Sequence, residues 1–238
     1  MMDYKSIYLA RRNPSCSAED WPRHWRSHAV FCSQFPAIGA PISSLHYCSR
    51  QLRPTLNGVP FDPPGVADYD GVAIVASQSA DSVSGRSLPR DLRDKVDQDE
   101  RRVFRTLTPN LTFLSEEVLV LGGKPGKAAV IRFLSRNAGS SREEFLARLG
   151  GVHADLAKTA VDVAGTVTRY VHNRLREDPP KGHPFDSIVE TWFASAEDAA
   201  QSLVAHAFAP LMKDIAAFCD MKQTVTMLTY VTHAWPRT

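Results

Sequence analysis

Residues 12–21 read RNPSCSAEDW and residues 136–145 read RNAGSSREEF, two stretches that share Arg-Asn, a serine, a glutamate and a final aromatic residue at the same spacing. Each stretch follows a strand-like segment, YKSIYLA at 4–10 and KAAVIRFL at 127–134. With one extra residue in the second copy, His28-Ala29 aligns with His153-Ala154. The pattern predicts the same strand, turn and helix occurring twice in this chain.

The similarity continues further along both halves. LHYCSRQL at 45–52 resembles RYVHNRL at 169–175, and YDGVAIVAS at 69–77 resembles FDSIVETWFAS at 185–195. The register of the first of these pairs is open by one or two residues, so the counterpart of His172 is not fixed. Gly and Pro interrupt LGGKPGK at 121–127. We therefore expect a first unit at 1–121, a linker at 122–127 and a second unit at 128–238.

Each half has the order strand, helix, strand, strand, helix, strand, which builds a ferredoxin-like unit with one helix-covered and one bare sheet face. Two such units can cover each other's bare faces. The sequence therefore predicts an α+β protein in which two tandem ferredoxin-like units, with antiparallel sheets, close into an intramolecular dimeric α/β barrel.

Composition excludes several functional classes. The 28 Lys and Arg nearly balance the 26 Asp and Glu, so no basic surface for nucleic acid is expected. No apolar run is long enough for a membrane span, and no secretory signal is visible. The four cysteines lack the close pairs of a metal site or disulfide scaffold. These features favour a cytoplasmic protein without nucleic-acid, membrane or metal partners.

Local signals refine the helices and loops. Ser141 and Glu144 form a capping box, whereas Pro22 favours a helix start near Asp20 in the first half. Residues 53–69 form a long Pro-rich loop of the kind that often serves as a lid. The first half also has an unusually charged helical region at 88–104.

Trp21, Trp25 and His28 fall on one helix face, which must point at the sheet. A histidine there is more often a core residue than a catalyst, and its recurrence as His153 does not change that. Alternatively, a shielded imidazole can take and return a proton at cellular pH. Both interpretations stay open for His28 and His153.

Candidate partners for the histidines lie on the predicted strands. They are His46 and Tyr47 in the first half, and Tyr170, His172 and Asn173 in the second. Because side chains alternate along a strand, Tyr170 and His172 share a face and Asn173 lies on the other.

Arg12 and Asp70 are further candidates at the ends of strands. Arg12 could bind a substrate carboxylate, although a solvated strand end is the more common role. Asp70 could contribute to a binding site, although an acidic residue at a strand start more often satisfies turn amides.

The order of S-x-E-E-F, His-Ala, RYVHNRL, FDSIVETWF and SAEDA resembles the EthD-like family of the dimeric α/β-barrel superfamily. The resemblance implies an internal pseudo-dimer, because these units usually pair between two chains. Relatives include polyketide cyclases, cofactor-free monooxygenases, a lactone isomerase and haem enzymes. EthD-like members are associated with ether degradation and with dehydratase or decarboxylase steps on aromatic polyketides.

We therefore expect a cofactor-free acid/base lyase, dehydratase or cyclase that acts on a small apolar carbonyl, phenolic or polyketide-like metabolite. His28 is the first candidate base, with Trp21, Trp25, His46, Tyr47, Arg12 and Asp70 around the substrate. His153, His172 and Tyr170, with Asn173, would serve a second pocket. The alternatives are a haem-binding enzyme and a non-catalytic ligand-binding accessory protein of a catabolic pathway; further homo-oligomers stay open.

Overall fold

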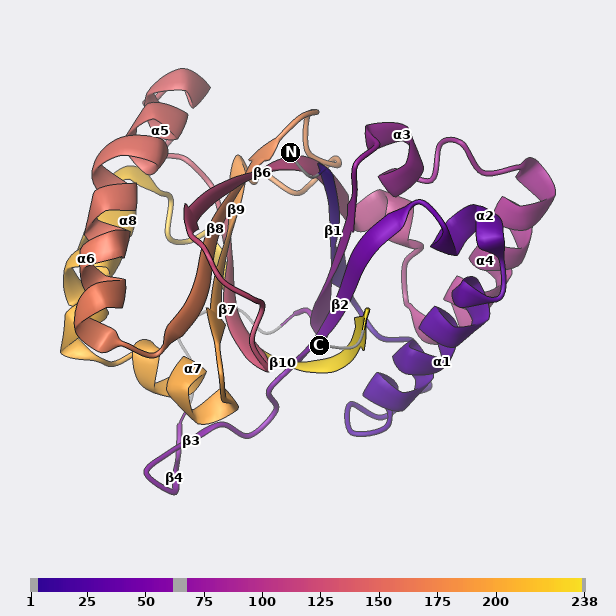
Figure 1. The fold of residues 1–238 in the computed structure, drawn as a ribbon, viewed down its shortest axis with the longest axis horizontal. Helices are drawn as coiled ribbons and strands as arrows, with labels where there is room; N and C mark the ends of the chain where they lie inside the picture. Colours follow the sequence, from indigo (N-terminus) through magenta and orange to yellow (C-terminus); the bar gives the residue numbers. More distant parts are fainter. Residues whose placement is uncertain (1–3, 62–67, 237–238) are drawn as a thin grey trace.

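The computed structural model describes residues 4–61 and 68–236, and its centre is a closed barrel of antiparallel strands (Figure 1). The strands of the barrel are β1 (Tyr4–Ala10), β2 (Ile42–Arg50), β5 (Gly71–Ser77), β6 (Thr112–Leu121), β7 (Ala128–Leu134), β8 (Val167–Leu175), β9 (Ser187–Phe193) and β10 (Val225–Trp235). They follow one another around the barrel in the order β1-β5-β2-β10-β7-β9-β8-β6.

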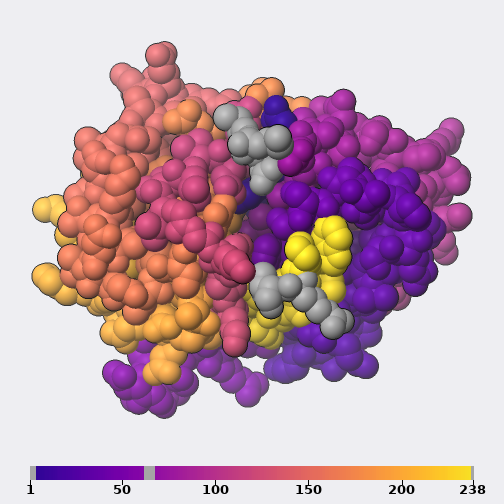
Figure 2. Space-filling view, in the orientation of Figure 1, coloured from indigo at the N-terminus to yellow at the C-terminus, as the bar shows by residue number. Residues whose placement is uncertain are grey.

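The barrel divides into two equivalent four-stranded sheets. The first has the order β6-β1-β5-β2 and the second the order β10-β7-β9-β8. The last strand of each sheet pairs with the other sheet, β6 with β8 and β10 with β2. Figure 2 shows the end of the chain, in yellow, against the indigo residues of the first half. The predicted pair of ferredoxin-like units in one barrel is confirmed.

Helices cover the outer faces of the two sheets on opposite sides of the barrel (Figure 1). The first half carries α1 (Trp21–Ser33), α2 (Pro36–Gly39), α3 (Ala80–Val83), α4 (Arg90–Val103) and the 3₁₀ turn η1 (Thr108–Leu111). The second half carries α5 (Arg142–Arg148), the π-helix η2 (Leu149–His153), α6 (Ala154–Ala164), α7 (Ala196–Ser202), the 3₁₀ turn η3 (His206–Phe208) and α8 (Ala209–Phe218).

The starts of the two histidine helices agree with their sequence signals. Ser141 and Glu144 form the capping box in both directions, which satisfies amides that the first turn leaves free. Asp20 is the N-cap of α1, and Pro22 lies in its first turn, where a missing N–H costs nothing. Gly71 is required beneath α1, because a Cβ there would lie 2.6 Å from the Trp25 ring.

The interior of the barrel has an apolar part and a charged part. Ile7, Phe113, Ile131, Phe133 and Phe185 belong to the apolar part. In the charged part, Lys5 Nζ lies 2.7 Å from carboxylate oxygens of both Glu117 and Glu190. Because all three side chains are largely removed from water, their opposite charges must compensate one another.

Two connecting segments were singled out in the sequence, the linker between the halves and the Pro-rich loop. Residues 122–127 join β6 to β7, the strands that end one half and begin the other. In the loop expected to be a lid, β3 (Thr55–Leu56) and β4 (Val59–Pro60) form a small hairpin, and residues 62–67 lie outside the described residues. No helix in the described ranges is long and apolar enough to cross a membrane.

Candidate functional site

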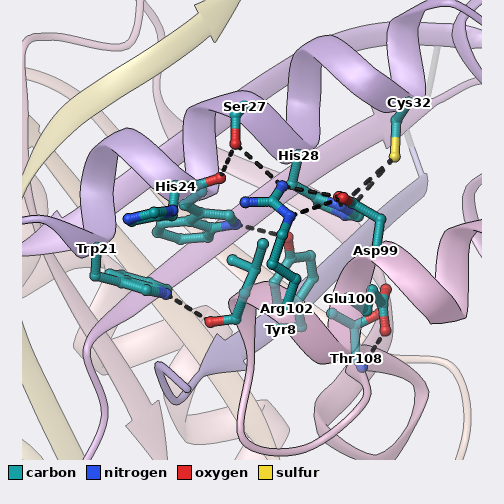
Figure 3. Close-up of polar contacts among 12 residues, drawn as sticks. Tyr8, Trp21, His24, Ser27, His28, Cys32, Asp99, Glu100, Arg102 and Thr108 are labelled. Carbon is teal, nitrogen blue, oxygen red and sulfur yellow. Dashed lines mark hydrogen bonds and ion pairs between the residues drawn. The ribbon is translucent and has the colours of Figure 1, made fainter. Parts of the chain in front are cut away.

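Each half contains a histidine–aspartate pair on the helical side of its sheet. His28 Nδ1 donates to Asp99 Oδ2 at 2.7 Å, between α1 and α4 (Figure 3). His153 Nδ1 donates to Asp214 Oδ2 at 3.0 Å, between η2 and α8. The duplicated histidines therefore retain duplicated carboxylate partners.

An arginine holds the other oxygen of each carboxylate. Arg102 donates to Asp99 Oδ1 at 3.0 Å, and Arg148 donates to Asp214 Oδ1. An ionised carboxylate only accepts hydrogen bonds, so each histidine carries its hydrogen on Nδ1 and its lone pair on Nε2. A fixed tautomer of this kind orients an imidazole for proton transfer at Nε2.

The two Nε2 atoms have different neighbours. In the first half the thiol of Cys32, one helical turn from His28, lies 3.7 Å from Nε2. In the second half the hydroxyl of Tyr170 lies 3.2 Å from His153 Nε2 and donates to it. A thiol is a weak donor, whereas a phenol is a strong one. The lone pair of His28 is therefore the more available of the two.

Burial lowers the pKa of His28 below its ordinary value, and the hydrogen bond and charge of Asp99 only partly oppose this effect. The imidazole is consequently neutral and able to accept a proton at pH 7. Burial also raises the pKa of Cys32 to about 12, so its thiol keeps its proton. Of these two groups, His28 is therefore the one that is able to accept a proton at pH 7, and Cys32 stays a thiol.

A cavity of about 1020 Å³ adjoins His28. It lies between the outer face of the first sheet and the helices that cover it. Its polar lining includes Tyr8, His28, Cys32, Tyr47, Glu100 and Thr108, and its apolar lining includes Ile38, Ile42, Leu45, Val75, Val83, Leu88 and Leu114. At its edge Arg86 pairs with Glu177 of the second half at 2.6 Å. An apolar cavity with few convergent polar groups is typical of a small-molecule site.

Two phenols line the cavity beneath His28. Tyr8 accepts a hydrogen bond from Trp25 Nε1 at 3.2 Å, and its hydroxyl also shares a hydrogen bond with that of Tyr47. Burial raises the pKa of both phenols, so both stay protonated at pH 7. Because Tyr8 accepts from Trp25, its own hydroxyl hydrogen is available to donate, and when Tyr47 is the donor of their shared bond that hydrogen is free for a group in the cavity.

Glu100 follows Asp99 on α4 and also lines the cavity. Its carboxylate accepts from the backbone N–H of Thr108 at 2.9 Å and from the Thr108 hydroxyl at 2.5 Å. Burial raises its pKa, and the hydrogen bonds from Thr108 oppose that rise. Glu100 therefore anchors η1 against the cavity and brings negative charge close to Tyr8 and Cys32.

The second half brings His153, Tyr170 and His172 together as the sequence predicted. Their rings lie side by side, with the His153 and His172 centroids 5.8 Å apart and the Tyr170 and His172 centroids 5.4 Å apart. All three are almost completely buried, and none of them lines the cavity of the first half. The sheet register shows that Tyr47 is the counterpart of His172, because Tyr47 pairs with Ala73 and His172 with Val189.

Two predicted binding residues lie on the other face of the sheet. His46 points into the barrel, where its ring lies 5.2 Å from that of Trp192. Asn173 also points into the barrel and donates to Glu190 at 2.8 Å. Because alternate residues of a strand face opposite sides, neither shares a pocket with its neighbours Tyr47 or His172. The structure therefore places both away from the histidines, and Tyr170 and Asn173 lie on opposite faces of the strand as expected.

Arg12 and Asp70 bind each other instead of lining the cavity. The Asp70 carboxylate accepts from the backbone N–H of Arg12 at 2.9 Å and from its guanidinium at 2.6 Å. Arg136 and Asp186 form the equivalent pair, with a backbone contact of 3.0 Å. This duplicated pair ties the end of one strand to the start of another in each half.

Trp21 and Trp25 are buried beside the site and support it without lining the cavity. Their rings stack 4.4 Å apart, and Trp25 stacks on Tyr47 at the same distance. Trp21 Nε1 donates to the carbonyl of Val103 at 3.0 Å. The aromatic stack therefore fixes Tyr47 and joins α1 to the end of α4.

Sequence reasoning missed Tyr8, Asp99, Glu100 and Asp214. The region at 88–104 is unusually charged, yet it contains six acidic or basic side chains before Asp99 and nothing in the sequence marks one of them as facing inward. The repeat did contain a signal. Asp99 lies five residues before Phe104, which bridges to Arg12, and Asp214 lies five residues before Cys219, which bridges to Arg136. Within the described residues, no three His, Cys, Asp or Glu side chains form a group that could hold a metal ion.

Comparisons with known proteins agree with this architecture. Residues 137–222 match the EthD domain family. A candidate monooxygenase of Fusobacterium nucleatum has a similar structure, with a TM-score of 0.54 and 6% identity over 98% of this chain and 93% of that one. An anthrone oxidase-like protein has a TM-score of 0.55 and 10% identity over 98% and 92% of the two chains.

A candidate chlorite dismutase is also similar, with a TM-score of 0.53 and 12% identity over 97% of this chain and 95% of that one. No curated protein matches the sequence significantly. At these identities the structural matches establish the fold alone. The C-terminal half thus resembles an EthD domain over residues 137–222, and the whole chain has the fold of dimeric α/β-barrel proteins.

Proposed function

From an EthD domain in the C-terminal half and a dimeric α/β barrel over the whole chain, we propose that this protein is a cofactor-free acid/base enzyme whose active site is the cavity of the first half. The observation that carries the proposal is the His28–Asp99 pair at the wall of a cavity of about 1020 Å³. The substrate is a small, largely apolar carbonyl or phenolic compound of polyketide type.

The proposed reaction begins with removal of a proton next to a carbonyl group. His28 Nε2 takes the proton, and Asp99 stabilises the imidazolium that forms. Tyr8 donates its hydroxyl hydrogen bond to the developing enolate oxygen. The enolate then collapses with loss of a β-leaving group or with ring closure, and His28 returns the proton. Lyase, dehydratase and cyclase chemistry share this first step.

Deuterium exchange tests the proton-transfer step without knowledge of the physiological substrate. The bicyclic aromatic ketone α-tetralone has exchangeable hydrogens next to its carbonyl, and their replacement in D₂O is visible by NMR. We expect wild-type protein to catalyse exchange and His28→Ala to lose it by about 10²-fold or more. His153→Ala is the matched control, since it removes the equivalent histidine from the half without the cavity, and it should retain exchange.

Equal exchange rates for wild type and His28→Ala would contradict the acid/base proposal. Binding of α-tetralone, detected as a rise in melting temperature, without any exchange would favour a non-catalytic ligand-binding role instead.

A haem-binding enzyme is the second candidate, and the His28–Asp99 pair again favours it. An imidazole that donates through Nδ1 to a carboxylate is the usual arrangement of a histidine that holds a metal through Nε2. In the first half, His28 would hold the iron, and bound haem would supply one-electron or oxygen chemistry. His153 does not fit that role, because both of its ring nitrogens already have partners.

Haemin titration separates the two candidates. A Soret band that develops in wild type and His153→Ala but not in His28→Ala would support haem binding. Its absence in wild type would remove this candidate.

A further inference from the structure

Arg132 is a buried cation in the second half for which no partner is present among the described residues. It extends from β7 toward the helices and is only 4% exposed. No hydrogen bond or ion pair joins its guanidinium to another described group, and its buried Nε is unpartnered. An uncompensated buried charge is costly, so something must offset it.

Two more unpartnered polar groups lie on the same face of the sheet. Arg132 on β7 and His172 on β8 both pair with Val189 of the intervening strand, so they lie on either side of it. Thr191 is two residues further along that strand and therefore points the same way. His172 Nε2 and Thr191 Oγ1 are buried without partners, as is Arg132 Nε. Three groups that can donate hydrogen bonds thus surround one stretch of β9.

The first half has different side chains at the equivalent positions. By sheet register, Tyr8 is the counterpart of Arg132, since Tyr8 pairs with Ala73 as Arg132 pairs with Val189. Val75 is likewise the counterpart of Thr191, because Leu45 pairs with Val75 as Tyr170 pairs with Thr191. In the second half, the Arg132 guanidinium and the Thr191 hydroxyl thus occupy the positions that Tyr8 and Val75 occupy in the first half.

The charged side chains around Arg132, His172 and Thr191 give this region a net positive charge. Arg132 and His153 are close enough for the guanidinium to lower the histidine pKa, and Arg174 acts on His172 in the same way. Asp214 is the nearby carboxylate, but Arg148 and His153 already bind its two oxygens. We infer that Arg132, His172 and Thr191 form a binding site for a small monovalent anion of halide size, separate from the cavity of the first half.

The helix above the site is also irregular. The π-helix η2 ends at His153, and such wide turns often occur at functional sites. Within η2, a Cβ on Gly150 would lie 3.2 Å from a guanidinium nitrogen of Arg174. The glycine therefore allows Arg174 to lie close to the helix backbone, where it adds to the positive charge that attracts an anion.

Thermal unfolding of the full chain tests the inference. In a HEPES–gluconate buffer of constant ionic strength, we expect chloride or bromide to raise the melting temperature with saturation, because an anion that binds only the folded state stabilises it. Gluconate itself is too large for a buried site. A melting temperature that depends on ionic strength alone would overturn the inference.

Two variants locate the effect. Arg132→Met removes the charge with little change in length and should weaken halide binding at least tenfold. Arg53→Met is the control, because that side chain is 87% exposed, and it should bind as wild type does. A halide response that persists unchanged in Arg132→Met would overturn the inference.

If Arg132→Met does not fold, bromide in crystals of the wild-type protein gives an independent answer. An anomalous peak within hydrogen-bond distance of Arg132 and His172 is expected. Ordered water alone at that position, without bromide, would overturn the inference.

Discussion

Leu45 in β2 and Tyr170 in β8 occupy equivalent positions in the two halves of the barrel. Leu45 pairs with Val75 and Tyr170 with Thr191, and both face the helices. Leu45 lines the large cavity, whereas Tyr170 donates its hydroxyl to His153 Nε2 and fills the corresponding space. The His28–Asp99 pair, with leucine at this position, therefore adjoins a cavity. The His153–Asp214 pair, with tyrosine there, is occluded.

Substitution of Leu45 by tyrosine should close the first cavity. We expect Leu45→Tyr to stay folded, because the second half already accommodates a tyrosine there, and to lose α-tetralone binding in a thermal-shift assay. Tyr170→Leu should instead lower the free energy of unfolding by about 1–3 kcal/mol, since it leaves both a void and an unpaired His153 Nε2. Full ligand binding by Leu45→Tyr would place the ligand elsewhere.

Asp99→Asn tests the direction of the pKa effect on His28. Burial lowers the pKa of His28 and Asp99 raises it, so loss of the carboxylate should lower that pKa further. The fall in α-tetralone exchange at acid pH should therefore move to lower pH in Asp99→Asn, while the plateau rate falls because the tautomer is no longer fixed. Exchange rates measured from pH 4 to 8 check both effects. If the fall in exchange at acid pH moved to higher pH in Asp99→Asn, the proposed effect of Asp99 on the His28 pKa would be contradicted.

The fold could be predicted from sequence because it depends on the order of elements, and that order is repeated. The faces of Trp21, Trp25 and His28 followed from helical spacing, and those of Tyr170 and Asn173 from strand alternation. The site could not be completed in the same way. Asp99 reaches His28 across 71 residues of sequence. His46 was misplaced because its face depends on a register that the repeat leaves open.

Buried neutral histidines should make the protein sensitive to acid. Burial lowers the pKa of His172 to about 3 and that of His46 to about 4. The unfolded chain then binds protons that the folded protein does not, so stability falls as pH drops below about 6.5 and continues to fall toward these lower values.

His172→Gln should make the acid loss shallower by up to about 1.4 kcal/mol per pH unit, the contribution of one proton. Urea denaturation between pH 4 and 7 measures this slope. An exposed substitution, Lys158→Met, should leave the slope as it is in wild type. The same slope in all three proteins would show that His172 is protonated in the folded state.

Lys5 should be essential for stability although it does not line the cavity. It is the shared cation of Glu117 and Glu190 inside the barrel. Burial raises the pKa of Glu117, but Lys5 and Arg169 more than offset this, so the pKa lies below its usual value. Lys5→Met would leave Glu190 without its cation and Glu117 with Arg169 alone, and it should lower the free energy of unfolding by about 3–5 kcal/mol at pH 7.

The loss in Lys5→Met should shrink in acid, because Glu117 with one cation fewer can be neutralised by a proton at higher pH than in wild type. Lys158→Met again provides the control, since its ion pair with Asp155 is exposed and worth little. Urea denaturation at pH 7 and pH 5 measures the difference. A loss that is equal at both pH values would mean that the packing of the Lys5 side chain, and not its charge, stabilises this part of the barrel.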